Sequence, residues 1–412
     1  MAVSLLLGSI AAGQDILVNQ DEEFEPKTAV APFAFYNENL DFGVGATFVS
    51  SGFLQEQMSL LLGGFYTTNG SMSFFFFGSD TKIPLGDRLF LDSRISLSKF
   101  QEFETYRDGN PRFPFERAGS HDSDEDNFIE GDGDDNFVRL NFKYLLPIGQ
   151  GRDKVINTYV LDQGLLAEGA TGGDQCFNPL ESGRTYVELE TFYRNQTVDT
   201  EYLDSVLRTN GLRLSLRYDN RDFAVNPSRG NALRMSVSRD FGAFDSTGSW
   251  TAVEGEFTQF VPFEPTEHFR QITLALNLWT SYAPTWEEDS GRPPPFAGAT
   301  LGGLNRLRGY PEGRFYDKAA INYVAELRLI PDWNPVGPDS VLDWLEVDWI
   351  MFAPFIEVGR VAEHWSVSAL HRDMKWSAGV GLRAMAKHVV LRIDTAYSPE
   401  GMRVQMMVLH PF

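Results

Sequence analysis

The chain has 412 residues, of which 42% are hydrophobic, and its 35 Lys and Arg against 57 Asp and Glu give a formal net charge of −22 at pH 7. This acidic balance argues against a nucleic-acid partner, because the phosphate backbone is negative as well. The single cysteine, Cys176, excludes an internal disulfide framework and a cysteine-rich metal site. The sequence also lacks the ~18 consecutive apolar residues of a membrane-spanning helix.

The first residues have the pattern of an export signal. "AVSLLLGSIAAG", residues 2–13, is apolar and ends in small residues, although no basic residue precedes it. We expect residues 1–13 to be a signal peptide with a truncated start, and residues 14–26 to form a short periplasmic segment. A soluble protein with an apolar N-terminus is the alternative interpretation.

From residue 27 to residue 412 the hydrophobic pattern has a period of two, which is typical of β-strands. In "GLRLSLRYD", for example, Leu212, Leu214 and Leu216 alternate with Arg213 and Arg217. About sixteen such segments occur, each near the ~10 residues that a tilted strand needs to cross a bilayer. Their centres lie near residues 32, 46, 62, 76, 94, 141, 190, 214, 235, 256, 276, 325, 356, 380, 392 and 407.

A soluble β-sandwich or propeller would alternate in the same way. Two features favour a membrane protein instead: the polar face carries Arg and Lys inside the strands, and the apolar face carries aromatic residues, often near strand ends. We therefore predict an all-β fold, a transmembrane antiparallel β-barrel of about 16 strands, formed by residues 27–412 and integral to a bacterial outer membrane. Outer-membrane lipid is then its immediate partner.

Charged residues are expected to line the barrel lumen. The alternation places the following residues on inward faces: Arg94, Arg139, Arg213, Arg217, Arg234, Arg328, Arg383, Arg392 and Asp394. Such a lining favours anions where a pore is open. The other possibility is that these arginines form internal ion pairs with Asp92, Glu326, Glu357 and Asp394.

Two connections between the expected strands are long. With both chain ends in the periplasm, residues 100–136 face outward, and their acidic run is expected to be a solvated surface loop. Asp122, Asp124 and Asp126 have the spacing of a calcium loop, but Asn127 replaces its glycine. Residues 146–184 face inward, where they either contact periplasmic partners or cover the mouth of the barrel.

The stretch "GGLNRLRGYPEG", residues 302–313, lies in the outward connection between the eleventh and twelfth strands. It resembles the inward-folded sixth loop of the bacterial surface antigen superfamily, which includes outer-membrane protein assembly factors and two-partner secretion transporters. Arg308, Gly309 and Tyr310 match the Arg-Gly-Phe/Tyr tip of that loop. Four further stretches resemble the family in the same order: "YDNRDFAVNPSRG", "YVAELRLIP", "FIEVG", and "WSAGVGLRAM" with "LRIDTAYSPEG". The resemblance implies that the tip is attached to the inner barrel wall.

The residues themselves support the same arrangement. Alternation points Glu326 and Glu357 into the lumen, and a buried guanidinium needs carboxylate partners because an unpaired buried charge costs several kcal/mol. Its planar fork suits bidentate contacts. Gly379 and Gly381 are expected to leave space for the tip on the inner wall, and Gly309 to permit a positive φ. The alternative is a free loop whose arginine contacts only water.

The last strand places Val404, Met406, Val408 and Phe412 on one side. This pattern resembles the C-terminal signal by which the barrel assembly machinery recognises a barrel for insertion, although an ordinary last strand would look the same. Pro411 lacks an amide hydrogen and weakens strand pairing there.

The resemblance suggests the barrel-only branch of the superfamily, because the segment between Gln14 and Lys27 has no room for a periplasmic POTRA domain. No catalytic motif, cofactor motif or histidine metal spacing is present, so we expect neither an enzyme nor a metal or cofactor site. Two functions remain. One is assistance to the insertion or transport of unfolded outer-membrane proteins or lipids through the seam between the first and last strands. The other is a passive, anion-favouring channel, and an adhesive role of the acidic loops is a weaker third.

Overall fold

The computed structural model describes residues 16–19, 26–37, 40–169, 172–200, 204–287, 290–337, 340, 346–386, 389–408 and 410–412. The expected signal peptide, residues 1–13, lies outside this range. Described strands form one 16-stranded antiparallel sheet in which each strand pairs with its neighbours in chain order. Its members are β2 (Lys27–Asn37), β3 (Asp41–Ser51), β4 (Ser59–Thr67), β5 (Met72–Lys82), β6 (Leu89–Thr105), β7 (Ile129–Leu145), β10 (Arg184–Asp199), β11 (Asp204–Asp219), β12 (Gly230–Phe241), β13 (Ser249–Phe263), β14 (Phe269–Tyr282), β17 (Ala319–Pro331), β18 (Val347–Ala362), β19 (Lys375–Ala386), β20 (Val389–Ser398) and β21 (Gly401–Val408).

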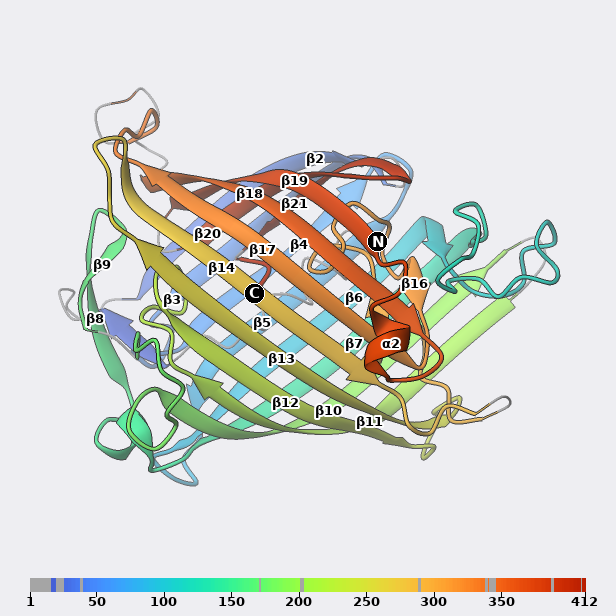
Figure 1. Cartoon of the computed structure of the whole chain (residues 1–412), viewed down its shortest axis with the longest axis horizontal. Coiled ribbons are helices and arrows are strands. Elements are labelled where there is room, and N and C mark those ends of the chain that lie inside the picture. The colour runs from blue at the N-terminus through green and yellow to red at the C-terminus, as the bar shows by residue number, and fades with distance from the viewer. Residues whose placement is uncertain are drawn as a thin grey trace.

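The sheet rolls into a barrel (Figure 1). Every predicted strand centre falls inside one of these strands, so the predicted number and placement of strands are confirmed. The roll is not closed by hydrogen bonds: over the described residues, β2 and β21 remain the two edges of the sheet, with no ladder between them.

The two faces of the sheet have the polarity of a lipid-wrapped barrel. On β11, Leu212, Leu214 and Leu216 are 41%, 57% and 48% exposed on the outer face, whereas Ser215 and Arg217 on the inner face are buried. Burying polar groups and exposing leucine suits a hydrocarbon environment outside the sheet. No helix in the described part of the chain is long and apolar enough to span a membrane.

The interior is not polar throughout. We expected aromatic residues on the lipid-facing side, but a buried cluster inside the barrel contains six phenylalanines, namely Phe65, Phe75, Phe77, Phe100, Phe103 and Phe137. They belong to β4, β5, β6 and β7. This part of the interior therefore packs as a dry apolar core, because the rings fill it against one another.

The outward connection between β6 and β7 lies against other outward segments. The Arg117 guanidinium contacts Asp317 Oδ2 at 2.7 Å, the Tyr316 amide donates to Gly119 O, and His121 Nε2 lies 2.8 Å from Asp373 O. Residues 106–128 therefore reach from β6 and β7 to the connections before β17 and β19. We call them the outer cover. Its acidic residues Asp122, Asp124 and Asp126 are exposed, as expected of a solvated loop. The rest of the acidic run, from residue 129, belongs to β7 instead, and Asp135 there is buried against Arg194.

The inward connection between β7 and β10 crosses the other end of the barrel. It contains a 3-10 turn, η1 (Gly149–Arg152), and two short strands, β8 (Asn157–Asp162) and β9 (Leu165–Glu168). We call residues 146–183 the inner cover, and Figure 1 shows β8 and β9 at the left end of the barrel. The strand β1 (Leu17–Asn19) pairs with β8 in parallel.

Contacts of the inner cover involve both sides of the barrel. Val155 and Ile156 pack against a buried cluster on β6, β7 and β10, to which Ile16 also belongs. Further along, Leu161 and Leu165 pack against residues of β17 to β20, and Trp349 Nε1 donates to Gly164 O at 3.0 Å. Of the two expectations for residues 146–184, these contacts favour a cover over the mouth.

Candidate functional site

A hairpin descends into the barrel between β14 and β17. Its base is the pair β15 (Thr300–Leu301) and β16 (Phe315–Tyr316), and we call residues 302–314 the tip hairpin. Leu307 and Tyr310 are buried in an apolar cluster with Trp279 of β14 and Ala320 of β17. Arg308 between them is 0% exposed. The connection between β14 and β17 thus folds into the interior, which is the arrangement that the family resemblance implied.

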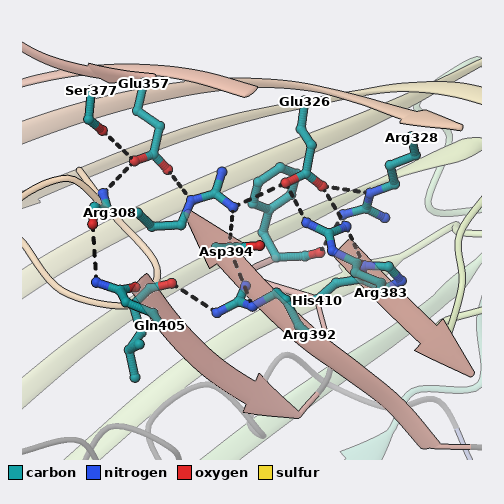
Figure 2. Close-up of polar contacts among 12 residues, drawn as sticks. Arg308, Glu326, Arg328, Glu357, Ser377, Arg383, Arg392, Asp394, Gln405 and His410 are labelled. Atoms are coloured by element: carbon teal, nitrogen blue, oxygen red, sulfur yellow. Dashed lines mark hydrogen bonds and ion pairs between the residues drawn. The ribbon is translucent and has the colours of Figure 1, made fainter. Parts of the chain in front are cut away.

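Arg308 contacts Glu357 of β18 through both its main chain and its side chain. The Arg308 amide donates to Glu357 Oε2 at 2.5 Å, and its Nε donates to Oε1 at 2.9 Å. Ser377 Oγ of β19 also donates to Oε2, at 2.9 Å, which orients the carboxylate (Figure 2). Such a charge-assisted, two-point contact fixes both position and direction of the arginine.

Two further carboxylates complete the surroundings of Arg308. Its Nη1 donates to Glu326 Oε2 of β17 at 3.2 Å and to Asp394 Oδ2 of β20 at 2.7 Å. The guanidinium also lies over the ring of Phe355, with Cζ 3.4 Å from the ring centre. The sequence predicted Glu326 and Glu357 as partners, but it placed Asp394 only in the lumen lining.

Other arginines surround the same carboxylates. Glu326 also binds Arg328 at 2.9 Å and Arg383 at 2.5 Å, and Asp394 lies 3.5 Å from Arg392. We call this group the tip cluster; it consists of Arg308, Glu326, Arg328, Glu357, Arg383, Arg392 and Asp394 (Figure 2). Each member is at most 2% exposed, so water cannot solvate these charges. The four guanidinium groups and three carboxylates therefore depend on each other for stabilisation.

The glycines of β19 make room for the partners of the tip rather than for the tip itself. A Cβ on Gly379 would lie 2.1 Å from Thr395 O of β20 and 2.6 Å from the Phe355 ring, and one on Gly381 would lie 2.5 Å from Asp394 Oδ1. Gly379 and Gly381 therefore let that ring and that carboxylate lie flat against the wall, where Arg308 contacts both. We expected these glycines to leave space for the tip itself, but the space beside them contains other groups.

Gly309 has another role than the one expected. Its φ is not positive, and the left-handed conformation at the tip belongs to Leu307, with φ 52°. A Cβ on Gly309 would lie 2.8 Å from Ser377 Cβ and 2.9 Å from Ser398 Cβ. Gly309 is thus required for close approach to the wall. Its carbonyl accepts a hydrogen bond from Ser398 Oγ at 2.8 Å.

The tip hairpin also contacts the last strand and β14, the neighbour of β17 in the sheet. Gln405 Nε2 of β21 donates to Arg308 O at 3.1 Å, and Arg314 Nε binds Glu400 in the β20–β21 turn at 2.8 Å. On the other side, Arg306 lies over the Trp279 ring of β14 at 3.9 Å. The hairpin therefore touches the edge strand β21 directly.

The C-terminal residues do not continue the alternation of β21. Val404 and Met406 are exposed on the outer face, but Phe412 is buried in a cluster with Phe260, Ala275 and Val324. The expectation that Phe412 shares their side is wrong, because the chain leaves β21 after Val408 and Pro411 cannot donate to a ladder. The side chain of Val408 lies outside the described part.

The remaining predicted lining residues lie on the opposite wall. Arg217 and Arg234 both bind Glu188, at 2.7 and 2.8 Å, and Arg213 lies 3.5 Å from Glu254. Arg94 is buried and Arg139 half-buried, as inward residues should be. Of the two possibilities for the lining, a charged surface that favours anions and internal ion pairing, these contacts correspond to internal ion pairing.

The predicted lining left out Lys143, a buried cation of this wall. Lys143 Nζ lies 2.5 Å from Asp80 Oδ1 and 2.7 Å from Asp92 Oδ1. Lys143 shares its strand face with Arg139, so the same alternation could have identified it. We call Asp80, Asp92, Lys143, Glu188, Arg217 and Arg234 the wall cluster. In the described part of the chain, no group of three or more His, Cys, Asp and Glu side chains could hold a metal ion.

Solved structures with the same architecture are outer-membrane barrels. BamA from Haemophilus ducreyi lacking POTRA domains 1–3 is 12% identical, with a TM-score of 0.51, over 93% of this chain and 69% of that one. CdiB from Escherichia coli is 11% identical, with a TM-score of 0.57, over 94% of this chain and 63% of that one. CdiB from Acinetobacter baumannii is 12% identical, with a TM-score of 0.50, over 93% and 58%. The chain thus spans less than two thirds of either CdiB.

No curated protein sequence matches this chain. The model of the Omp85 superfamily domain matches residues 179–405, which include the tip hairpin and the last ten strands of the sheet. The resemblance noted in the sequence is confirmed by this match. Because the match covers more than half of the chain and the sheet forms the same kind of barrel, the chain belongs to the Omp85 superfamily of integral outer-membrane proteins.

Proposed function

We propose that this barrel assists the insertion or transport of protein or lipid at the outer membrane, with the tip hairpin positioning the edge strand β21. The observation that carries the proposal is the contact of Gln405 on β21 with the carbonyl of Arg308, whose side chain binds β17, β18 and β20. Arg308, Gly309, Tyr310, Glu326 and Glu357 then join the last strands into one block beside the seam.

The seam offers a place for an incoming strand. An edge strand presents unpaired N–H and C=O groups, and an extended segment can add to it through main-chain hydrogen bonds. Within a bilayer such unpaired groups are costly, so pairing with another strand is strongly favoured there. Over the described residues, β2 pairs with β3 and β21 pairs with β20, but β2 and β21 do not pair with each other. This supports the seam between them as the working region.

A passive, anion-favouring channel is the second candidate, and the inward arginines favour it. Two observations weaken it. The tip cluster and the wall cluster neutralise most of these arginines with carboxylates, and the outer and inner covers lie across the two ends of the barrel. A resting barrel of this kind would carry little current.

We also propose that Val404 and Met406, 59% and 55% exposed on the outer face of β21, belong to the signal for the barrel's own insertion. Phe412 would act in this signal before folding, since in the folded barrel it is buried. Residues 1–13 would direct export, and residues 14–26 would remain in the periplasm.

Reconstitution in liposomes tests the main proposal. Conductance and the insertion rate of an unfolded barrel substrate are measured with the wild-type protein, with Arg308→Ala and with Arg372→Gln, whose side chain is 79% exposed on the β18–β19 connection. We expect accelerated insertion with the wild type and the control, and loss of the acceleration with Arg308→Ala. A steady anion-selective current without acceleration would favour the channel instead.

A further inference from the structure

A cavity of about 240 Å³ opens at the outward end of the barrel, beside the outer cover. Its lining residues come from five separate segments of the sequence. They include Arg107, Asp108, Arg208, Trp250, Arg292 and Tyr316, together with the prolines at 293–295. The cavity is separate from the tip cluster, and the proposed function makes no use of it.

Arg107 is the unusual residue in this cavity. It is 5% exposed, its Nη1 donates to Ser205 Oγ at 2.8 Å, and its Nη2 donates to Gln196 Oε1. These acceptors are neutral, and its Nε has no acceptor among the described residues. Within that part of the chain, no carboxylate forms an ion pair with it. Asp135 acts on it electrostatically but binds Arg194 through both oxygens.

A buried cation without a carboxylate costs several kcal/mol, so a missing anion is the simplest partner for it. Burial lowers the pKa of the Arg107 guanidinium to about 10, which leaves it charged at neutral pH. Two more cations line the same space. Arg208 lies 3.9 Å from Asp245, and Arg292 Nη1 donates at 3.5 Å to Asp108, which lines the cavity as well. Guanidinium groups bind phosphate and carboxylate in a bidentate manner.

The other lining residues indicate what carries the anion. Arg292 lies over the Tyr316 ring at 4.9 Å, which holds it in place, and the largely buried side chains of Trp250, Tyr316 and the prolines form an apolar side of the cavity. An apolar side beside charged groups suits the ring of a sugar, which is polar at its edges and apolar on its faces. The cavity is smaller than the ~300–1,000 Å³ of drug-sized sites, so it suits a single small ring.

We propose that this cavity binds an acidic or phosphorylated sugar, with Arg107 as the buried anion ligand and Arg208 and Arg292 at the rim. The ligand is either the headgroup of a glycolipid in the outer leaflet or a free sugar phosphate, since both present the same chemistry at this end of the barrel.

Calorimetric titration of the full-length folded barrel tests this proposal. The probes are glucose 6-phosphate, glucose, inorganic phosphate, and vesicles of phosphatidylcholine with or without lipopolysaccharide. We expect Arg107→Gln to weaken the binding of the sugar phosphate, or of the lipopolysaccharide vesicles, by at least about tenfold. Arg112→Gln, an exposed arginine of the outer cover outside the cavity, should leave binding unchanged. If only the lipopolysaccharide vesicles bind, the ligand is the headgroup of a glycolipid. If only glucose 6-phosphate binds, the ligand is a free sugar phosphate.

Heat-modifiable mobility on gels shows whether each variant folds. Should Arg107→Gln fail to fold, the rim variants Arg208→Gln and Arg292→Gln carry the test, because each is half-buried or exposed and each should weaken binding. Absence of binding to every anionic probe, or binding that none of the three variants weakens, would overturn the proposal. Inorganic phosphate bound as tightly as the sugar phosphate would overturn the assignment to a sugar.

Discussion

The tip cluster and the wall cluster use the same residue types on opposite walls of one barrel, yet they connect different things. In the wall cluster, Lys143 of β7 binds acids of β5 and β6, and Glu188 of β10 binds arginines of β11 and β12. All of these partners lie on adjacent or next-adjacent strands. The cluster therefore stabilises the sheet within itself.

In the tip cluster, Arg308 comes from outside the sheet. It binds three strands at once, and its main chain contacts a fourth, β21. On one wall, the inward charges thus pair between neighbouring strands. On the other wall, similar charges bind a separate segment, the tip hairpin. The difference lies in geometry: the hairpin is long enough to reach the wall, and Gly309 allows its tip to approach closely.

Removing the guanidinium should have the largest effect. Arg308→Ala leaves Glu326, Glu357 and Asp394 facing a cavity with fewer cations, and we expect the free energy of unfolding to fall by about 3–5 kcal/mol. Urea unfolding in phospholipid vesicles measures it. The tip hairpin should also leave the wall, so trypsin should cleave after Arg306 or Arg314, which the folded wild type protects.

The matched variant Arg308→Lys keeps the charge but loses the planar fork, so its stability should lie between those of the wild type and Arg308→Ala. Equal stability of all three proteins would show that the ion pairs of the tip do not hold the hairpin. The comparison with the wall cluster would then fail at its first step.

Lys143→Met tests the other wall. It leaves Asp80 and Asp92 close together without their cation, and we expect a loss of about 3 kcal/mol, at the lower end for a broken buried pair. Unlike Arg308→Ala, it should leave the hairpin protected from trypsin and the insertion rate unchanged. Cleavage at Arg306 in this variant would mean that the two clusters are coupled through the barrel.

Gly309→Ala changes no charge. Its Cβ would meet Ser377 and Ser398, so the tip must shift away from β19 and β20, and we expect a loss of about 2 kcal/mol with partial trypsin cleavage of the hairpin. Gly86→Ala is the control, because a Cβ there has no neighbour within 4 Å. A Gly309→Ala protein as stable and as protected as this control would rule out close approach as the reason for the glycine.

These residues also show what could be predicted from the sequence. Alternation correctly gave the inward direction of Glu326, Glu357 and Asp394, because a strand has only two faces. It could not give the pairing of Asp394 with Arg308, which depends on how far the hairpin descends. It also could not distinguish a glycine needed for positive φ from one needed for close approach, so Gly309 was interpreted wrongly.

The covers were the least predictable part. β8 and β9 have six and four residues, too few for a periodic pattern to stand out, and β8 pairs with β1, more than 130 positions earlier. Phe412 illustrates the same limit at the other end: its place in the alternation was clear, but its burial depends on contacts with Phe260 and Val324, which are remote in sequence.

The smallest effect is expected for Arg234→Gln in the wall cluster. Its side chain is 25% exposed and its partner Glu188 keeps Arg217, so the loss should not exceed about 1 kcal/mol. Because this pair is reached by water, the loss should shrink further in 1 M salt, where the Debye length is about 3 Å. The effect of Arg308→Ala should persist in the same salt, since its partners are at most 1% exposed. Urea unfolding of both variants at low and high salt separates them, and an Arg234→Gln loss as large and as salt-resistant as that of Arg308→Ala would show that the wall cluster is equally sealed from solvent.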